Sequence, residues 1–467
     1  MARDAATQRV EITFLGTPPA KQIERASGVT DVQVDGQMVR CLVCGSFQPI
    51  LEAVRGYEVI NLTAIPALDR IEVNPQGDKQ MTDHHALRTQ MKAITQTAFG
   101  SPDVLQLSDV PKPSPQRGEV LVRVSAASPN PWDWHFMRGL PYVSRLAGAG
   151  LRTPKNTILG SDVAGHVEAL GDGVTQFDPG DEVYGFVGAG AFAEYVSVPA
   201  DFLGLKPANL TFEQAAAIPL AGMTALQGLR DAGNIRAGQH VLIIGASGGV
   251  GTLAVQIAKS FGTTVTGVCS TPNVELVRSL GADHVVDYTR DDVTRSDGTY
   301  DLIFQLAGTT WPSAFRRVLS PSGTLVLSSG DSTGRIIGPM NRMVGAVILS
   351  AFTSQTLRPL TTTRSRQDLE HLRDLVEDGK LTPVIEGTYP LSASADAVRH
   401  LETGHVRGKL TISVRSADPA AQRLEAPAST EVAPTGKRPS PTAEVHRAGR
   451  AQRTASNSLH PIQGGTT

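Results

Sequence analysis

The stretch "GQHVLIIGASGGVGTLAVQIAK" (Gly238–Lys259) combines a short apolar run, a cluster of glycines and an amphipathic segment. The run "HVLIIG" is typical of a central parallel strand that is covered on both faces. The following "GGVGTLAVQIAKSFG" places its apolar residues on one helical face and ends at Gly262, a natural helix stop. This stretch therefore predicts a strand, a glycine-rich turn and a helix in direct succession.

The glycines of this turn predict a binding site for a diphosphate. Because they lack Cβ atoms, they allow a tight turn, a close approach of phosphate to backbone N–H groups, and close packing of helix on strand. The helix N-terminus adds a partial positive charge that favours an anion. The residues predicted to bind a cofactor here are Gly245, Ala246, Ser247, Gly248, Gly249, Val250 and Gly251.

Alternating strand-like and helix-like segments continue after this stretch. A helix-like segment, "NVELVRSLG" (Asn273–Gly281), follows the next strand. The strand-like segments are "TTVTGVC" (Thr263–Cys269), "HVVDY" (His284–Tyr288), "DLIFQLAG" (Asp301–Gly308) and "GTLVLSSG" (Gly323–Gly330). Such alternation predicts an α/β fold with a doubly wound parallel sheet that binds a dinucleotide.

Residues 91–414 carry five further motifs that point to a known family. They are "GSDVAGHVEALGDGVTQFDPGDEVYG", "GAFAEYVSVPA", "AAAIPLAGMTALQGL", "RSLGADHVVDYT" and "GHVRGKLTISV". Together with the glycine-rich stretch, they resemble the zinc-independent quinone oxidoreductase and zeta-crystallin group of the medium-chain dehydrogenase/reductase superfamily. The resemblance implies a GroES-like β-barrel catalytic domain, a Rossmann domain and a return of the chain to the barrel. It also implies a metal-independent reductase of quinones or α,β-unsaturated carbonyls.

The N-terminal segment forms a unit of its own. Its expected order β-α-β-β-α-β, with a hairpin at Asp35-Gly36, predicts a small ferredoxin-like α+β module. Its motifs "GVTDVQVDGQMVRCLV" and "EVINLTAIPALDRIEV" resemble the accessory C-terminal domain of drug-export ABC ATPases. The last segment has no aromatic residue and few large aliphatic ones, so we expect it to be disordered. The predicted divisions are the module (1–75), a linker (76–90), the GroES-like domain (91–212), the Rossmann domain (213–355), the return to the catalytic domain (356–415) and the tail (416–467).

The end of the second strand bears on the choice of cofactor. It reads "VCSTPN" (Val268–Asn273) and lacks the acid that hydrogen-bonds the ribose in NAD-binding folds. The small hydroxyls of Ser270 and Thr271 leave room for a 2′-phosphate, so we expect NADP(H) rather than NAD(H). By the resemblance, Tyr288 stands where the family has a phosphate-binding tyrosine, and Asn273 replaces the family's lysine.

The resemblance also suggests which residues meet the nicotinamide and the substrate. It places Asn130 beside both, which makes Asn130 the candidate catalytic residue, and Asp133 is read as polar lining of the substrate site. Tyr142 belongs to an apolar loop (138–156) that, like residues 334–352, lines a bulky substrate site, a dimer interface or simply core. Other expected cofactor contacts are Thr224, Ala307, Gly308, Gly330 and Lys409.

The sequence predicts no metal site. Where zinc-dependent relatives have their ligands, this chain has Asn130 and Ser161-Asp162, and it has no cysteine between Cys44 and Cys269. Sites poor in thiolate rarely hold zinc. The pair Cys41-x-x-Cys44 falls inside a predicted strand and has no second pair, so we read both as ordinary strand residues.

Composition limits the partners and the location. The 43 basic and 45 acidic residues nearly cancel, so no net positive charge recruits nucleic acid. The most apolar run, "MVGAVILSAF" (Met343–Phe352), is about half the length of a membrane span. We expect a cytoplasmic homodimer that takes a small hydrophobic carbonyl or quinone. Two alternatives remain open: an NAD(P)-dependent alcohol or aldehyde dehydrogenase, and a cofactor-sensing or transporter-associated binding protein.

Overall fold

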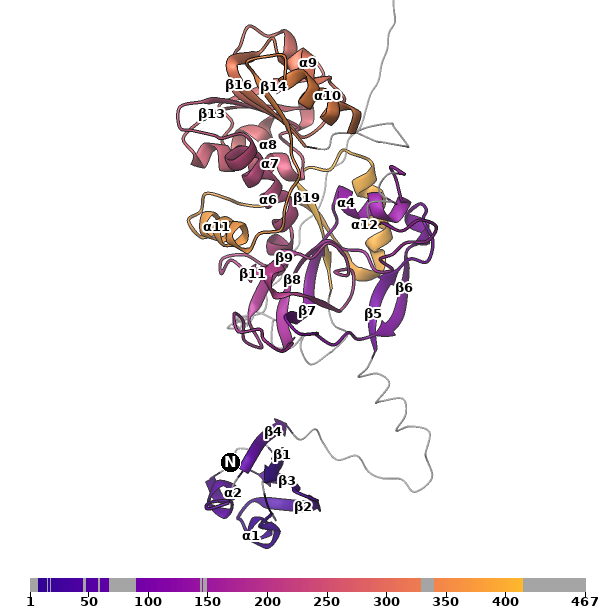
Figure 1. The fold of residues 1–467 in the computed structure, drawn as a ribbon, viewed down its shortest axis with the longest axis vertical. Coiled ribbons are helices and arrows are strands. Elements are labelled where there is room, and N and C mark those ends of the chain that lie inside the picture. The colour runs from indigo at the N-terminus through magenta and orange to yellow at the C-terminus, as the bar shows by residue number, and fades with distance from the viewer. Residues whose placement is uncertain are drawn as a thin grey trace, which may run out of the picture. The chain divides into compact units, whose positions relative to one another are not determined.

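The structure is a computed structural model that describes residues 7–14, 16, 18–44, 48–57, 59–66, 90–142, 145, 149–328 and 340–414. The chain divides into two compact units, Met1–Gln90 and Met91–Thr467. Figure 1 shows the helices and strands of both. The predicted tail, residues 416–467, lies outside the described residues, as does the predicted linker except for Gln90.

The first unit has one antiparallel sheet with the strand order β2-β3-β1-β4. The turn between β2 and β3 contains Gly36 at a φ of +60°, as the Asp35-Gly36 signal predicted. A small core of its own includes Val10, Ile12 and Phe14, together with Ile23 and Ile50 from the helices. The elements are β1 (Thr7–Phe14), α1 (Ala20–Glu24), β2 (Val29–Asp35), β3 (Met38–Cys44), α2 (Gln48–Ala53) and β4 (Val59–Pro66).

The first part of the second unit is built on a sheet with the order β11-β9-β8-β7-β19-β18, in which β10 also pairs with β7. A separate two-stranded sheet joins β5 to β6. Because β18 and β19 lie late in the chain, the polypeptide does return to this sheet. The strands are β5 (Gln90–Thr95), β6 (Gln106–Pro111), β7 (Glu119–Ser128), β8 (Asp162–Leu170), β9 (Glu182–Phe186), β10 (Tyr195–Pro199), β11 (Leu203–Leu205), β18 (Ile385–Pro390) and β19 (Lys409–Ser413). The helices are α4 (Pro131–Arg138), α5 (Phe212–Ala216) and α12 (Ser394–Glu402).

The second part is a six-stranded parallel sheet with the order β14-β13-β12-β15-β16-β17. Counted from its first strand, this is the order 3-2-1-4-5-6 of a Rossmann fold. Its last strand lies just beyond the predicted boundary at residue 355. The strands are β12 (His240–Ile244), β13 (Thr264–Cys269), β14 (His284–Asp287), β15 (Tyr300–Gln305), β16 (Leu319–Leu327) and β17 (Thr356–Pro359). The helices are α6 (Pro219–Gln227), α7 (Gly249–Ser260), α8 (Val274–Ser279), α9 (Pro312–Phe315), α10 (Met340–Ser350) and α11 (Arg366–Glu377).

One hydrophobic core joins the two parts of the second unit. It contains Val241 and Ile243 of β12 and Leu253 of α7, and it extends to Ala164 and Tyr184 of the catalytic sheet. Val241, Leu242 and Ile243 of β12 are fully buried, which explains why the sequence is continuously apolar there. This shared core fixes how the glycine-rich turn faces the catalytic sheet.

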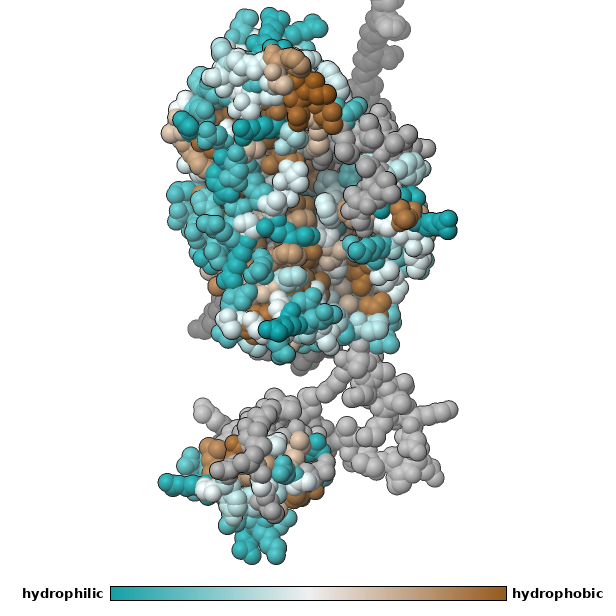
Figure 2. All heavy atoms as spheres, viewed as in Figure 1, coloured by the Kyte–Doolittle hydropathy of each residue, from teal (hydrophilic) through white to brown (hydrophobic). Residues whose placement is uncertain are grey.

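Helix α10 presents an apolar face to the surface. Val344, Val347 and Ile348 are each more than half exposed, and Phe352 just after the helix is 82% exposed. Figure 2 shows this apolar area over the helix that Figure 1 labels α10. Among the described residues, no helix has the length and apolar character needed to cross a membrane.

Candidate active site

The glycine-rich turn lies between β12 and α7, as predicted. A Cβ added to Gly251 would stand 2.0 Å from the backbone oxygen of Gly245, so only glycine lets the helix pack against the turn. Gly248 caps the N-terminus of α7 and, having no side chain, leaves the first N–H groups of that helix without a side-chain cap. Because these groups have no acceptor within the helix, they are available to an anion. The turn therefore fits the diphosphate of a dinucleotide.

The segment before β19 closes over this turn. The Gly408 N–H donates a hydrogen bond of 2.8 Å to the Ser247 carbonyl, and Gly248 and Gly408 form an isolated parallel bridge. The Lys409 side chain runs past Gly249, since a Cβ on that glycine would lie 2.9 Å from the Lys409 Cδ. The Lys409 Nζ then donates to the Asn130 Oδ1 at 2.5 Å. Lys409 thus connects the turn to the catalytic domain.

Five polar side chains meet at that point, and we call them the buried polar cluster. The Asn130 Nδ2 donates to Asp162 at 2.8 Å and to Ser161 at 2.9 Å, and Ser161 donates to Asp133 at 2.7 Å. The Lys409 Nζ lies 3.7 Å from the Asp162 carboxylate. All five residues are at most 6% exposed. The structure therefore brings together Asn130, Asp133 and Lys409, three of the predicted site residues.

Asp133 occupies the cluster because of the way α4 begins. Asn130 and Asp133 form a capping box, in which the Asn130 N–H donates to the Asp133 Oδ2 at 2.8 Å. The other carboxylate oxygen accepts the Gly160 N–H at 3.1 Å. Both carboxylate oxygens of Asp133 thus accept hydrogen bonds from other groups of the protein. This geometry favours a role for Asp133 in positioning the cluster, whereas the sequence suggested direct lining of the substrate site.

The two carboxyl groups of the cluster titrate in an unusual range. The pKa of Asp133 is raised to about 7, chiefly by burial and in part by the neighbouring Asp162 charge, against the lowering effect of the hydrogen bonds that the carboxylate accepts. Burial also raises the pKa of Asp162 to about 6, opposed chiefly by the Lys409 charge. Burial lowers the pKa of Lys409, while the two carboxylates oppose that change. Such shifts are typical of functional sites.

The amide of Asn130 is already fully engaged. Its nitrogen carries two hydrogens but faces three acceptors, because the Ser128 carbonyl lies 3.3 Å away in addition to Ser161 and Asp162. Its oxygen accepts from Lys409. A substrate oxygen can therefore bind this nitrogen only by displacing one of these partners.

Residues expected at the adenosine end gather at the carboxyl edge of the parallel sheet. The Asn273 Nδ2 donates to the Ser270 hydroxyl at 3.2 Å, and the Thr271 hydroxyl donates to Asp287 at 2.5 Å. Tyr288 follows Asp287 and is 59% exposed. The hydrogen bond from Thr271 is the main reason that the pKa of Asp287 is lowered. Asp287, which ends the third strand beside Cys269 of the second, was not predicted from the sequence.

The other expected cofactor contacts lie around the same sheet edge. The Thr224 hydroxyl donates to the Leu220 carbonyl at 2.7 Å and lies 2.9 Å from the hydroxyl of Thr362. Ala307 stands against Gly245, whose added Cβ would come within 2.8 Å of the Ala307 Cβ. The Gly308 carbonyl accepts a hydrogen bond of 2.6 Å from Arg342. Gly330 lies outside the described residues.

Comparison with known proteins identifies the family. Residues 116–208 match the family model "Alcohol dehydrogenase GroES-like domain", and residues 280–412 match "Zinc-binding dehydrogenase". A quinone-oxidoreductase homolog from Spinacia oleracea chloroplasts is 34% identical over 338 residues, which cover 69% of this chain and 98% of that protein. The chain belongs to the medium-chain dehydrogenase/reductase superfamily.

Other members of the superfamily agree with this assignment. The chloroplastic NADPH-dependent alkenal/one oxidoreductase of Arabidopsis thaliana is 33% identical over 71% of this chain and 82% of its own length. The solved quinone oxidoreductase from Coxiella burnetii superposes with a TM-score of 0.62 at 33% identity, covering 70% of this chain and all of that one. The predicted GroES-like and Rossmann architecture is therefore confirmed. The resemblance of residues 1–75 to the ABC ATPase accessory domain stays a prediction.

By the resemblance, Asn130, Ser161 and Asp162 stand where zinc-dependent members of the superfamily bind metal. An amide, a hydroxyl and one carboxylate fit zinc poorly, because zinc prefers thiolate and imidazole. Within the described part of the chain, no three His, Cys, Asp or Glu residues come close enough together to hold a metal ion. Cys41 is buried in β3.

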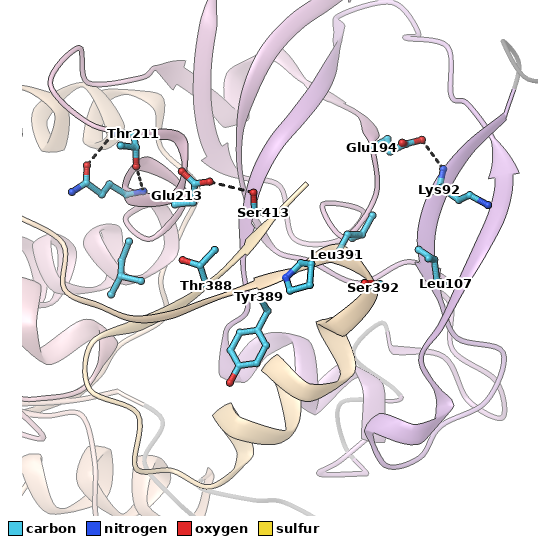
Figure 3. A pocket seen from close by; sticks show the side chains of 13 residues that line it. Lys92, Leu107, Glu194, Thr211, Glu213, Thr388, Tyr389, Leu391, Ser392 and Ser413 are labelled. Atoms are coloured by element: carbon cyan, nitrogen blue, oxygen red, sulfur yellow. Dashed lines mark hydrogen bonds between the residues drawn. The ribbon is translucent and has the colours of Figure 1, made fainter. Parts of the chain in front are cut away.

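The second unit of this chain also forms an open pocket of about 700 Å³ away from these residues (Figure 3). It is lined by β5, β6 and β18 and by residues such as Glu213, which accepts a 3.3 Å hydrogen bond from Ser413. None of the predicted site residues lines it. The candidate site is therefore the glycine-rich turn together with the buried polar cluster.

Two exposed aromatic side chains belong to the same part of the chain: Trp132, which the sequence did not single out, and Tyr142, which it proposed for the substrate site. Trp132 is 40% exposed, and its indole N–H donates to the Gly188 carbonyl at 3.0 Å. Tyr142 is 46% exposed, and the guanidinium of Arg145 lies 5.0 Å from its ring. Trp132 could have been noticed, because it follows Asn130 by two positions at the start of α4. Phe136, one of its ring partners, lies in the same helix, but Phe186 and Gly188 come from a distant part of the chain and gave no local signal.

Proposed function

We propose that the protein is an NADPH-dependent, metal-independent oxidoreductase that reduces quinones or α,β-unsaturated carbonyls by hydride transfer. The observation that carries this proposal is the connection made by Lys409, whose backbone region closes the glycine-rich turn and whose ammonium group enters the buried polar cluster. Through this single residue, the expected diphosphate site at the turn is connected to the buried polar cluster. Relatives whose names state alkenal/one and quinone oxidoreductase activities support the same reading.

In this reaction the residues of the chain bind and orient the cofactor and the substrate. NADPH, when bound, supplies the hydride, and the acceptor carbon takes it while the acceptor oxygen gains an electron pair and then a proton from solvent. The turn and the N-terminus of α7 hold the diphosphate. Lys409 and Asp162 fix the amide of Asn130, which would lie beside the reacting groups. Positioning of this kind is the main contribution that a protein makes to cofactor chemistry.

The preference for NADPH is part of the proposal. Ser270 and Thr271 place hydroxyl groups at the end of β13, and the Asn273 Nδ2 donates to the Ser270 hydroxyl at 3.2 Å. The carboxylate of Asp287 accepts a hydrogen bond from the Thr271 hydroxyl. Its negative charge would repel a 2′-phosphate and so reduces the expected preference for NADPH. We therefore expect a modest preference for NADPH over NADH.

The test is a substrate screen that follows the oxidation of NADPH by the loss of its absorbance. Quinones and enones should oxidise NADPH, and simple aldehydes should react far more slowly. Tight NADPH binding without turnover on any acceptor would instead favour a cofactor-sensing binding protein. Oxidation of simple alcohols with NAD(P)⁺ as the main activity would favour an alcohol dehydrogenase.

Two further expectations remain proposals. The homodimer is supported by the exposed apolar face of α10, which packs beside β17 at the edge of the parallel sheet. Sedimentation of the purified chain would measure its mass in solution. The cytoplasmic location rests on the sequence alone, and fractionation of cells would test it.

A further inference from the structure

Arg364 is a cation that has no carboxylate partner among the described residues, and it lies close to the candidate site. Its guanidinium lies between two aromatic rings, with Cζ at 4.7 Å from the centroid of Phe186 and 4.6 Å from that of Phe202. Its Nε donates to the Phe186 carbonyl at 3.1 Å, and its Nη2 lies 3.4 Å from the Val187 carbonyl. All of these partners are neutral. By contrast, the nearby Arg366 pairs with Glu370 at 3.0 Å.

The surroundings leave this positive charge unopposed. Within the described ranges no ion pair reaches Arg364, and partial burial lowers the pKa of its guanidinium with no carboxylate acting to raise it. Arg138 differs, because Glu402 raises its pKa through a hydrogen bond. Arg364 is nevertheless exposed to solvent. Of its five N–H groups two are used, which leaves three for a ligand.

A row of packed aromatic rings, whose exposed surface is provided by Trp132, extends from Arg364 through the buried Phe186. The rings of Trp132 and Phe186 meet edge to face with centroids 5.9 Å apart, and Trp132 stacks on Phe136 at 4.7 Å. The indole is fixed by its hydrogen bond to Gly188. Trp132 is 40% exposed, and an exposed, immobilised aromatic ring of this kind binds flat rings well.

Hydrogen bonds connect the segments that carry Arg364 and Phe186 to the buried polar cluster and to Thr224, one of the expected cofactor contacts. The backbone N–H groups of Val187 and Gly188 both donate to the Ser161 carbonyl, at 2.7 and 3.1 Å. On the other side, Thr362, two residues before Arg364, contacts Thr224. Gly188 has a φ of +89°, and a Cβ there would come 2.1 Å from the Arg364 Nη2, so glycine is required for the guanidinium to approach.

We propose that Arg364 and Trp132 form a subsite for an acceptor that carries an anionic group on a flat ring, such as a quinone with a carboxylate or sulfonate substituent. The proposal rests on the proposed function, since it names a substrate class for that site. The guanidinium would bind the anion through its free, fork-like N–H groups, and the indole would stack on the ring.

Binding of a non-reducible probe tests the subsite without reference to activity. Titration calorimetry of the NADP⁺-saturated protein would compare naphthalenesulfonate with the neutral ring naphthol. Arg364→Gln should raise the dissociation constant of the sulfonate roughly 10-fold or more and that of naphthol less than about 2-fold. Arg366→Gln, the matched control, should change neither. Trp132→Leu should weaken both.

Kinetics then separates this proposal from the proposed function. A sulfonated naphthoquinone should show a KM that rises about 10-fold in Arg364→Gln, while the KM for the unsubstituted naphthoquinone stays nearly constant. Equal weakening of the charged and the neutral ring would mean that Arg364 only clamps the Phe186–Gly188 backbone, and would overturn the subsite. A loss of NADPH affinity in Arg364→Gln would overturn it too, because the bound anion would be the cofactor's phosphate. If no quinone or enone oxidises NADPH, the proposed function fails, and the calorimetry alone decides the subsite.

Discussion

At the scale of single residues, the buried polar cluster shows how a few side chains constrain one another. Lys409 supplies the positive charge that two buried carboxyl groups share, and its pKa is lowered by the same burial that raises theirs. Asn130 sits at the centre with its hydrogen-bonding groups engaged. A cluster with all of its members paired holds one geometry, and removal of any partner leaves a buried polar group unsatisfied.

The raised pKa of Asp133 predicts a particular dependence of stability on pH. Its folded-state pKa of about 7 exceeds the ordinary value of 3.8, so the folded state binds more protons than the unfolded state between these values. The contribution of Asp133 to the free energy of unfolding is therefore largest below its ordinary pKa and is lost as the pH rises toward 7. In Asp133→Asn this contribution should disappear, so that stability falls less steeply over the same range. Urea unfolding at several pH values measures both slopes, and identical slopes would contradict the shift.

The end of β13 predicts an effect on cofactor choice. Asn273→Lys places a cation beside Ser270 and should tighten NADPH binding by about 10-fold, most strongly at low salt, while NADH binding barely changes. Ser270→Asp should favour NADH, because a carboxylate would face the 2′-phosphate. Fluorescence titration with both cofactors measures the effect. A change that is equal for NADPH and NADH would show that residue 273 does not face the phosphate.

At the scale of elements, the glycines of the strand–turn–helix unit differ in the space that surrounds them, a difference that the sequence does not show. A Cβ on Gly248 would have only the Gly245 oxygen nearby, at an ordinary 3.5 Å, whereas a Cβ on Gly249 would crowd the Lys409 Cδ at 2.9 Å. Gly248→Val should therefore fold normally and lose NADPH affinity by roughly 100-fold, since its side chain fills diphosphate space. Gly251→Val should instead destabilise the fold, because its Cβ would overlap the Gly245 oxygen. Thermal melts and cofactor titrations of both variants distinguish the two effects.

The elements also show what local sequence can predict. Five strands of the parallel sheet were predicted from short apolar runs, of which Val241 to Ile243 of β12 are fully buried. The sixth strand, β17, was not predicted, because its sequence TLRP holds a single buried apolar residue, Leu357. Asp287 was missed because it reaches Thr271 from a neighbouring strand. The engagement of Asn130 was missed as well, since it depends on Lys409 from the far end of the domain. Contacts between distant segments leave no pattern in a single stretch of sequence.

At the scale of the whole molecule, the two units have separate cores. The core of the first unit is formed by residues such as Val10, Phe14 and Ile50, whereas the core that joins the Rossmann and catalytic sheets draws only on the second unit. Every described residue of the candidate site also belongs to the second unit. The chemistry and most of the stability of that unit should therefore not depend on the first.

We accordingly expect a chain of residues 90–414 to keep the activity of the full protein. The cut at residue 90 preserves β5, whose backbone bonds to the rest of the barrel at Lys92 and Ile94. The kcat, and the KM for NADPH with a quinone, should each stay within about 2-fold, because no site contact is removed. The melting temperature of the second unit should shift by no more than a few degrees, since its core is intact. Loss of activity in a chain that still melts cooperatively would show that residues 1–89 or 415–467 contribute to the site, and restoring each segment in turn would identify which one does.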